Sequence, residues 1–278
     1  MIRKCYAKLN LSLDSLFKRE DGYHEIDSLM VRISLADKIE IKKNPYKKIR
    51  IFTESKKLLS IEDNLVYKAW NILKDNIEDN GVDIILEKNI PFAAGLAGGS
   101  TDAAETLKAL NELWDLGFSQ KELMDKALML GADVPFFFMR KPARARGIGE
   151  ILTSFDIKND LYFLLVNDGT EISSAFIYSK LADYGYIDNE KIISLLEKGD
   201  KNAYSYFSNV MEDVAFETYP HLKDIKKEIK DSGALASLMS GSGATIFGVF
   251  EDEDLLKKAY DKIKDKYKFV KKVNLVND

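Results

Sequence analysis

The sequence predicts an α+β protein with two domains. From Cys5 to Asp14, apolar and polar residues alternate with the period of two that is typical of a strand with one buried face. Toward the other end of the chain, segments with strand and helix periodicity follow one another in the order of a split β-α-β motif. A polar stretch at residues 155–160 separates the two halves, so we expect domains at 1–157 and 158–278.

Apolar spacing and helix caps indicate the other elements of the first half. Asn64 can cap a helix that carries an apolar side over residues 66–73. Asp102 and Glu105 have the spacing of a capping box, which predicts a helix over 102–114. Strands are expected over residues 26–35, 38–42, 48–53 and 82–86.

The same signals continue after residue 114, through the end of the first half and into the second. Ser119 and Glu122 predict a capped helix that ends near Leu130, with Gly131 as its C-terminal cap. Further helices are expected over residues 174–184, 189–197, 204–216, 221–231 and 252–264. Further strands are expected over residues 161–166, 234–239, 244–250 and 269–276.

Composition narrows the classes of function. The chain has 41 Lys and Arg against 45 Asp and Glu, a net charge of −4, whereas a nucleic-acid-binding protein would normally be basic. Its single cysteine, Cys5, excludes an intrachain disulfide and a multi-thiolate zinc site, and is expected to be a core residue. No long apolar run predicts a membrane span, and the polar N-terminus lacks the core of a signal peptide. We therefore expect a cytoplasmic enzyme.

A glycine-rich segment that opens a helix is the strongest local signal. Backbone N–H groups at a helix start, bared by glycine, offer donors and a positive dipole end to phosphate. The segment lacks the lysine of a P-loop and does not match the Rossmann fingerprint, and a plain glycine-rich connection is the alternative. Its hydroxyls, on Ser100 and Thr101, can add donors or a ligand for Mg²⁺. The residues are Pro91, Phe92, Ala93, Ala94, Gly95, Leu96, Ala97, Gly98, Gly99, Ser100 and Thr101.

Two charged residues are candidates for catalysis. Asp133 precedes the apolar residues 134–138, which would partly desolvate its carboxylate and raise its proton affinity toward that of a useful base. A helix-capping or turn aspartate is the alternative. Lys8 lies on the polar face of the first strand, where a cation could pair with a catalytic carboxylate or stabilise a transferring phosphoryl group. A solvated strand lysine is the alternative.

Two turns are candidates for ligand contacts. In the first, over residues 21–25, Tyr23 could stack on a planar base while His24 forms a hydrogen bond with the edge of that base. An ordinary surface histidine is the alternative, and His221 is expected only to start a helix. The second, the Gly/Ser turn at 239–244, either approaches a ligand closely or is a plain hairpin turn.

In combination, these signals resemble the GHMP kinase superfamily. Five segments carry the resemblance, in order and across most of the chain: 7–10, 21–25, 91–104, 131–136 and 239–243. Gly-Tyr-His-Glu and Gly-Ala-Asp-Val-Pro-Phe within them single out the members that act on a cytidine diphosphate-linked methylerythritol. The resemblance implies an N-terminal domain with a left-handed β-α-β unit and a ferredoxin-like C-terminal domain.

The resemblance also implies a reaction and the residues for it. The reaction is ATP-dependent phosphorylation of the 2-hydroxyl of that small molecule in non-mevalonate isoprenoid biosynthesis, with Mg²⁺ held through the ATP phosphates and Ser100 as its candidate protein ligand. Asp133 takes the position of the base, and Lys8 that of its partner, which holds the carboxylate ionised and offsets charge on the γ-phosphoryl group. Residues 91–101 take the position of the ATP phosphate loop.

For the substrate, the resemblance implies that His24 reads the cytosine edge, that Tyr23 and Tyr178 lie on either side of the ring, and that Asn10 contacts the substrate near the reacting hydroxyl. No nucleic-acid or membrane partner is expected, and the chain is expected to be a monomer or weak homodimer.

The sequence departs from the family pattern in places. Ala97 stands where glycine is common, which is tolerated if its φ stays below zero. Arg140, Lys141 and Pro142 replace a stretch that is usually richer in glycine. Two alternatives to the proposed reaction remain: another small-molecule GHMP kinase, and a catalytically silent member that binds a nucleotide or a protein.

Overall fold

The computed structural model describes residues 1–54, 61–77, 81–182 and 184–276. The contacts divide the chain into two compact units. Unit 1 is formed by residues 1–7, 35–92 and 97–139, and unit 2 by residues 8–34, 93–96 and 140–278. Strands β1 (Ile2–Lys18) and β2 (His24–Lys43) contribute to both units. The domain boundary expected at 157/158 stays a prediction.

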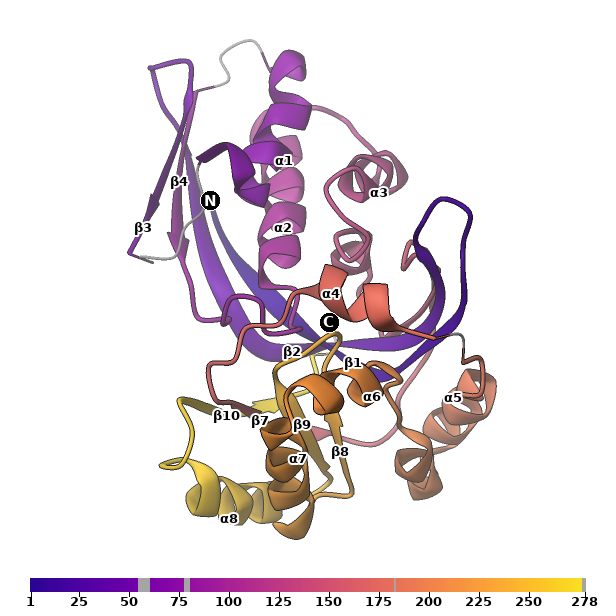
Figure 1. Ribbon diagram of the computed structural model, residues 1–278. Coiled ribbons are helices and arrows are strands. Elements are labelled where there is room, and N and C mark those ends of the chain that lie inside the picture. Colours follow the sequence, from indigo (N-terminus) through magenta and orange to yellow (C-terminus); the bar gives the residue numbers. More distant parts are fainter. Residues whose placement is uncertain (55–60, 78–80, 183, 277–278) are drawn as a thin grey trace. The chain divides into compact units, whose positions relative to one another are not determined.

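Unit 1 contains a β-α-β arrangement (Figure 1). Strand β3 (Ile49–Thr53) pairs in parallel with β4 (Val82–Glu87), which pairs antiparallel with residues 38–43 of β2. Helices α1 (Leu65–Leu73) and α2 (Gly98–Leu113) pack against each other. The unit also contains η1 (Ile61–Asp63), η2 (Lys74–Asn76), α3 (Gln120–Leu128) and η3 (Pro135–Phe138).

Two N-terminal helix caps of unit 1 are confirmed and a third is wrong. The Asn64 side chain accepts from the N–H of Val66 over 2.9 Å, and Ser119 caps α3 with a complete capping box. Helix α3 ends at Leu128, two residues earlier than expected, and its C-terminal cap is Met129 and not Gly131. Helix α2 begins at Gly98 instead of Asp102, and the side chain of Asp102 forms an ion pair and does not cap the helix.

The residue ahead of α2 also differs from expectation. Ala97 is the N-cap of α2 and has φ +54°, so its φ is not below zero. Gly98 starts the helix against Ile90, where a Cβ on Gly98 would lie 2.9 Å from the Ile90 Cγ2 atom. This close approach explains why the helix can begin within the glycine run.

The two long strands differ from the prediction in burial and extent. Lys8 and Asn10 were expected on the polar face of β1, and they are only 4% and 1% exposed, so the alternative of a solvated strand lysine is wrong. Both faces of this strand are therefore buried over residues 7–15. The predicted strands 26–35 and 38–42 form the single strand β2, because Ala36 and Asp37 between them do not break the extended backbone.

Unit 2 contains the ferredoxin-like sheet expected from the end of the chain. Its strands are β7 (Tyr162–Asn167), β8 (Ala236–Met239), β9 (Ile246–Phe250) and β10 (Phe269–Asn274). Their spatial order is β10-β7-β9-β8, and every pair is antiparallel. Helices α7 (His221–Asp231) and α8 (Glu253–Ile263) pack on this sheet (Figure 1).

The remaining elements of unit 2 include two strands that were not predicted. Strands β5 (Ala143–Gly147) and β6 (Ile151–Ser154) form a hairpin, and β5 pairs with residues 26–30 of β2. The predicted helix 204–216 is wrong. A 3₁₀ helix and an α-helix occupy that region, separated at Asn209, whose Oδ1 accepts from the N–H of Met211. The other elements are α4 (Ser174–Lys180), α5 (Asn189–Lys198), η4 (Lys201–Tyr206) and α6 (Met211–Thr218).

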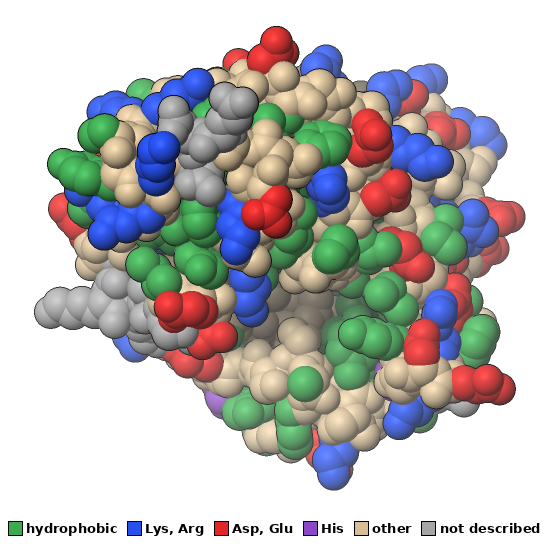
Figure 2. All heavy atoms as spheres, turned by 90° about the horizontal axis from the view of Figure 1, so that it is seen from above, with side chains coloured by type: hydrophobic (Ala, Val, Ile, Leu, Met, Phe, Trp, Pro, Cys, Tyr) green, Lys and Arg blue, Asp and Glu red, His purple; other side chains and the backbone are tan. Residues whose placement is uncertain are grey.

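Charged side chains of both signs are interspersed on the face shown in Figure 2. None of the helices in the described part of the chain is both long and apolar enough to cross a membrane.

Candidate active site

Two glycine-rich turns, predicted separately, pack against each other within unit 2: residues 93–96 of the glycine-rich segment and the Gly/Ser turn at 239–244. Ser240 Oγ donates to the carbonyl oxygen of Gly95 over 3.0 Å, and the N–H of Thr245 donates to the carbonyl oxygen of Ala94. Gly95 has φ +74°, and a Cβ there would lie 1.9 Å from the carbonyl oxygen of Ser240. Only glycine allows this approach of one backbone to the other.

Lys8 and Asn10 lie beside these turns. Lys8 Nζ donates to Asn10 Oδ1 over 2.6 Å, and Asn10 Nδ2 donates to Ser28 Oγ over 2.8 Å. A Cβ on Gly241 would lie 3.5 Å from Lys8 Nζ and 3.6 Å from Asn10 Oδ1. The backbone N–H of Lys8 also donates to the carbonyl oxygen of Leu96. A buried cation thus lies against glycine backbone, an arrangement that suits an anionic ligand.

The first turn of α2 supplies donors of another kind. Its first intrahelical hydrogen bond runs from the N–H of Thr101 to the carbonyl oxygen of Ala97, and Ala97 forms no side-chain cap. The N–H groups of Gly98, Gly99 and Ser100 come before that bond, so helix geometry gives them no acceptor within the helix. They lie at the positive end of the helix dipole. These donors fit the phosphates of a nucleotide. Thr101 is 1% exposed and Ser100 is half-buried, so Ser100 is the better candidate for a hydroxyl that contacts a ligand.

Asp133 lies in unit 1 between α3 and η3. It is half-buried and is followed by the buried residues Val134 and Pro135. The role of Asp133 as the base stays a prediction. Because Asp133 belongs to unit 1 and Lys8 to unit 2, the expected meeting of their side chains stays a prediction.

The residues expected to hold a nucleobase divide into a pair and a separate tyrosine. The rings of His24 and Tyr178 contact each other, with centroids 5.6 Å apart and planes tilted by 39°. His24 is buried, and its Nδ1 atom lies 3.0 Å from Ser15 Oγ. Among the described residues Nε2 is not engaged in this way, so it is the ring nitrogen that could meet a ligand. Tyr23 is 59% exposed, so its expected place on one side of the base stays a prediction.

Family models match both halves of the chain. The model described as GHMP kinases N terminal domain matches residues 64–141, and the one described as GHMP kinases C terminal matches residues 190–268. The chain belongs to the GHMP kinase family. It is therefore an ATP-dependent kinase, and its two-domain α+β fold is the fold of this family.

Two relatives that cover nearly all of this GHMP kinase carry the name 4-diphosphocytidyl-2-C-methyl-D-erythritol kinase. The protein from Thermoanaerobacter pseudethanolicus is 42% identical, over 96% of this chain and 93% of its own. The protein from Alkaliphilus metalliredigens is 38% identical, over 95% of this chain and 93% of its own.

Solved structures agree with this family. A crystal structure of 4-(cytidine 5'-diphospho)-2C-methyl-D-erythritol kinase superposes with a TM-score of 0.86 at 32% identity and covers 100% of both chains. Homoserine kinase from Cytophaga hutchinsonii, at 19% identity, covers 98% of this chain and 95% of its own with a TM-score of 0.74 and is alike in fold alone.

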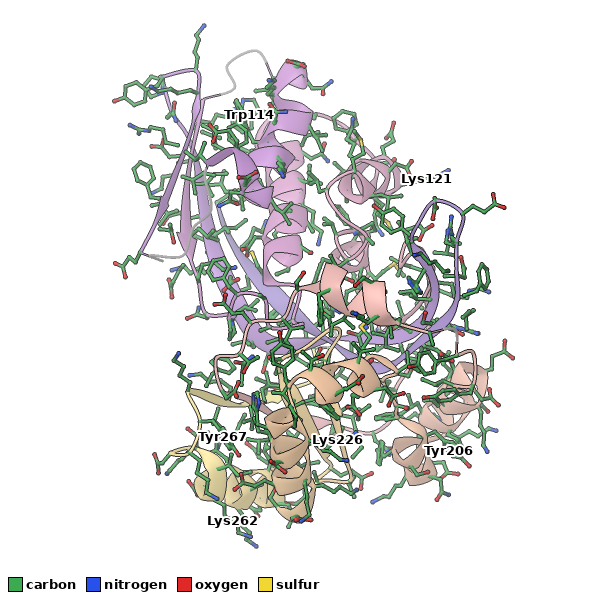
Figure 3. The ribbon with its side chains drawn as sticks, viewed as in Figure 1. Trp114, Lys121, Tyr206, Lys226, Lys262 and Tyr267 are labelled. Carbon is green, nitrogen blue, oxygen red and sulfur yellow. The ribbon has the colours of Figure 1, made fainter. Side chains whose placement is uncertain are left out.

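Sequence reasoning missed the residues that hold the second glycine turn of this kinase. The Asn209 amide donates to the carbonyl oxygens of Met239 and Gly241 over 2.7 and 2.8 Å. Glu212 accepts from the N–H of Met239 over 2.7 Å and pairs with Lys226, which Figure 3 labels on α7. Nothing in the local sequence marks Asn209 or Glu212, because their partners lie about 30 residues away along the chain.

Proposed function

We propose that this GHMP kinase transfers the γ-phosphoryl group of ATP to the 2-hydroxyl of 4-diphosphocytidyl-2-C-methyl-D-erythritol, in non-mevalonate isoprenoid biosynthesis in the cytoplasm. The cluster of Lys8, Asn10 and the two glycine turns carries the proposal, because it supplies a buried cation beside a backbone suited to phosphate. The shared name of the full-length relatives supports the choice of substrate.

In the proposed reaction, the substrate loses one proton and gains one phosphoryl group. The Asp133 carboxylate accepts the proton of the 2-hydroxyl, whose oxygen forms a bond to the γ-phosphorus as the bond from that phosphorus to the β–γ bridging oxygen breaks. The products are ADP and the phosphorylated substrate. Lys8 offsets negative charge on the transferring group, while Asn10 holds the lysine in place.

The first turn of α2 would bind the phosphates of ATP through the N–H groups of Gly98, Gly99 and Ser100. Mg²⁺ bound through the phosphate oxygens would neutralise part of their charge, with the Ser100 hydroxyl as the candidate protein ligand. The chain's own contribution is to hold the triphosphate in one orientation.

The pair formed by His24 and Tyr178 would bind the cytosine. Tyr178 offers a ring for stacking, and the Nε2 atom of His24 is available to the edge of the base. Tyr23 would cover the other side of the base from its exposed position.

A coupled assay of ADP release tests the substrate assignment. The purified chain with Mg-ATP should release ADP with the cytidyl substrate and show no release above background with mevalonate or homoserine. A cytidine nucleotide should compete with the substrate. Turnover of mevalonate or homoserine in place of the cytidyl compound would instead assign another GHMP kinase activity. Calorimetric binding of nucleotide without any ADP release would indicate a silent member of the family.

A further inference from the structure

Lys88 is a buried cation that the proposed mechanism does not use. It directly follows β4 in unit 1, and its side chain is 8% exposed. Its Nζ atom contacts two carboxylates: Asp37 on β2 and, over 2.6 Å, Asp102 in the second turn of α2. One lysine thus joins two strands to the beginning of the helix whose N–H groups are candidates for phosphate binding.

The second carboxylate oxygen of Asp37 holds the backbone that leads into the glycine-rich segment. It accepts from the N–H of Asn89 over 2.5 Å and from the N–H of Ile90 over 2.8 Å. The start of α2 lies against the same place, because a Cβ on Gly98 would be 2.9 Å from Ile90 and 3.5 Å from Asp37. The backbone just before residue 91 and the start of α2 are therefore both attached to the cluster of Asp37, Lys88 and Asp102.

This cluster is poorly explained as a device for stability. Asp37 is 0% and Asp102 2% exposed, and one oxygen of Asp102, Oδ1, has no hydrogen-bond partner among the described residues. Burying charges costs hydration, which offsets much of their mutual attraction, so buried ion pairs add little net stability. What such a cluster does supply is fixed geometry, since each charged group tolerates few arrangements of its partners.

We propose that Lys88 is a positioning residue for nucleotide binding, which acts through Asp102 to hold the first turn of α2 in place before the phosphates arrive. The proposal rests on the proposed function, because it takes the N–H groups of residues 98–100 as phosphate donors. Donors that are already oriented need no ordering when the ligand binds. Lys88 should therefore strengthen the binding of ATP and not that of the cytidyl substrate.

Lys88→Met tests the proposal because methionine keeps much of the length of the side chain and removes the charge. We expect the KM for ATP to rise about tenfold or more, while the KM for the cytidyl substrate stays within about twofold. Lys88→Arg should restore part of the ATP affinity. Asp102→Asn should change the KM for ATP in the same direction, and the double variant should be no worse than Lys88→Met alone.

Hydrogen exchange provides a readout that does not depend on activity. Without nucleotide, the amides in the first turn of α2 should exchange faster in Lys88→Met and Asp102→Asn than in the unaltered chain. Arg3→Met is the matched control, because it breaks the ion pair with Glu112 near the opposite end of α2, where Figure 3 labels Trp114. This control should leave both KM values and the exchange of the first turn unchanged.

The outcomes separate the two proposals. A folded Lys88→Met or Asp102→Asn with unchanged KM for ATP and unchanged exchange would overturn the positioning role, as would an equal rise of both KM values. If Lys88→Met does not fold, Asp102→Asn alone decides. If the unaltered chain gives no ADP release with any acceptor, the proposed function fails, and the exchange measurement still decides whether Lys88 anchors the helix.

Discussion

Lys8 donates a 2.6 Å hydrogen bond to Asn10, which lies two residues further along the same face of β1. The bond fixes the ammonium group beside the backbone of Gly241. A hydrogen bond to a charged group is worth about 1.5–3 kcal/mol, so Asn10→Ala should lower kcat by about tenfold to a hundredfold. Steady-state ADP release measures the effect. Ser28→Ala removes the acceptor of the Asn10 amide and the hydrogen bond from the Ser28 hydroxyl to the carbonyl oxygen of Ser12, but it leaves the bond from Lys8 to Asn10 in place. It should therefore cost less, and the reverse order would contradict this role for Asn10.

Asp133→Asn should abolish most turnover without loss of ligand binding. The amide cannot accept the proton of the hydroxyl, and general-base catalysis contributes about 10²–10⁴ in rate. We expect that loss in kcat, with nucleotide and cytidyl affinities by calorimetry close to those of the unaltered chain. A folded variant with near-normal turnover would exclude Asp133 as the base.

Gly95→Ala should be far more damaging than Gly117→Ala. The two glycines have nearly equal φ values, +74° and +73°, so alanine costs about 1–2 kcal/mol of conformational strain at either position. A Cβ at Gly117 meets nothing within 4 Å, whereas at Gly95 it overlaps the carbonyl oxygen of Ser240. We expect a further loss of about 1–3 kcal/mol in the free energy of unfolding for Gly95→Ala, measured in urea. Equal losses of unfolding free energy in the two variants would show that the two turns can move apart to accommodate the added methyl group.

Stability should depend on pH through Asp102. Burial, together with the carboxylate of Asp37, raises its pKa from 3.8 to about 7 despite the attraction of Lys88. Between these values the folded chain keeps a proton that the unfolded chain has released, so the free energy of unfolding should fall as pH rises from about 4 to 7. The thiol of Cys5, which also faces this group, does not titrate in that window, because burial raises its pKa further from neutrality.

Asp102→Asn should flatten this part of the pH profile, because the amide does not titrate. Urea unfolding at several pH values measures the difference between the variant and the unaltered chain. Asp125→Asn is the control, since Asp125 is exposed on α3 of the same unit. Parallel profiles for Asp102→Asn and the unaltered chain would contradict the raised pKa.

His24→Phe and Tyr178→Ala should weaken binding of the cytidyl substrate selectively. Stacking on an aromatic side chain is worth about 1–3 kcal/mol per base, which corresponds to a rise in the substrate's KM of about tenfold or more for Tyr178→Ala. The KM for ATP should not change. His221→Phe replaces the other histidine, which is half exposed and pairs with Asp168, and should leave both values unchanged. An unaltered cytidyl KM in Tyr178→Ala would remove the ring from the proposed site.

Features that depend on neighbouring residues could be predicted from the sequence. The caps at Asn64 and Ser119 were found because a capping side chain binds a backbone N–H two or three residues away. The ferredoxin-like sheet followed from the order of strands and helices after residue 160, because short apolar runs between the helical patterns mark its strands. The candidate site residues followed from residue types typical of their chemistry and from the family resemblance.

Contacts between distant parts of the chain were decided only by the tertiary structure. Asp102 has the spacing of a capping residue but pairs with Lys88, and Lys88 also reaches Asp37, 51 residues earlier. Asn209 holds Gly241 although no motif connects the two residues. Local spacing reports only which groups a short stretch of backbone can bring together. Which buried charge or amide meets which partner depends on how strands and helices pack, because in a buried environment each polar group must find whatever partner the packing places beside it.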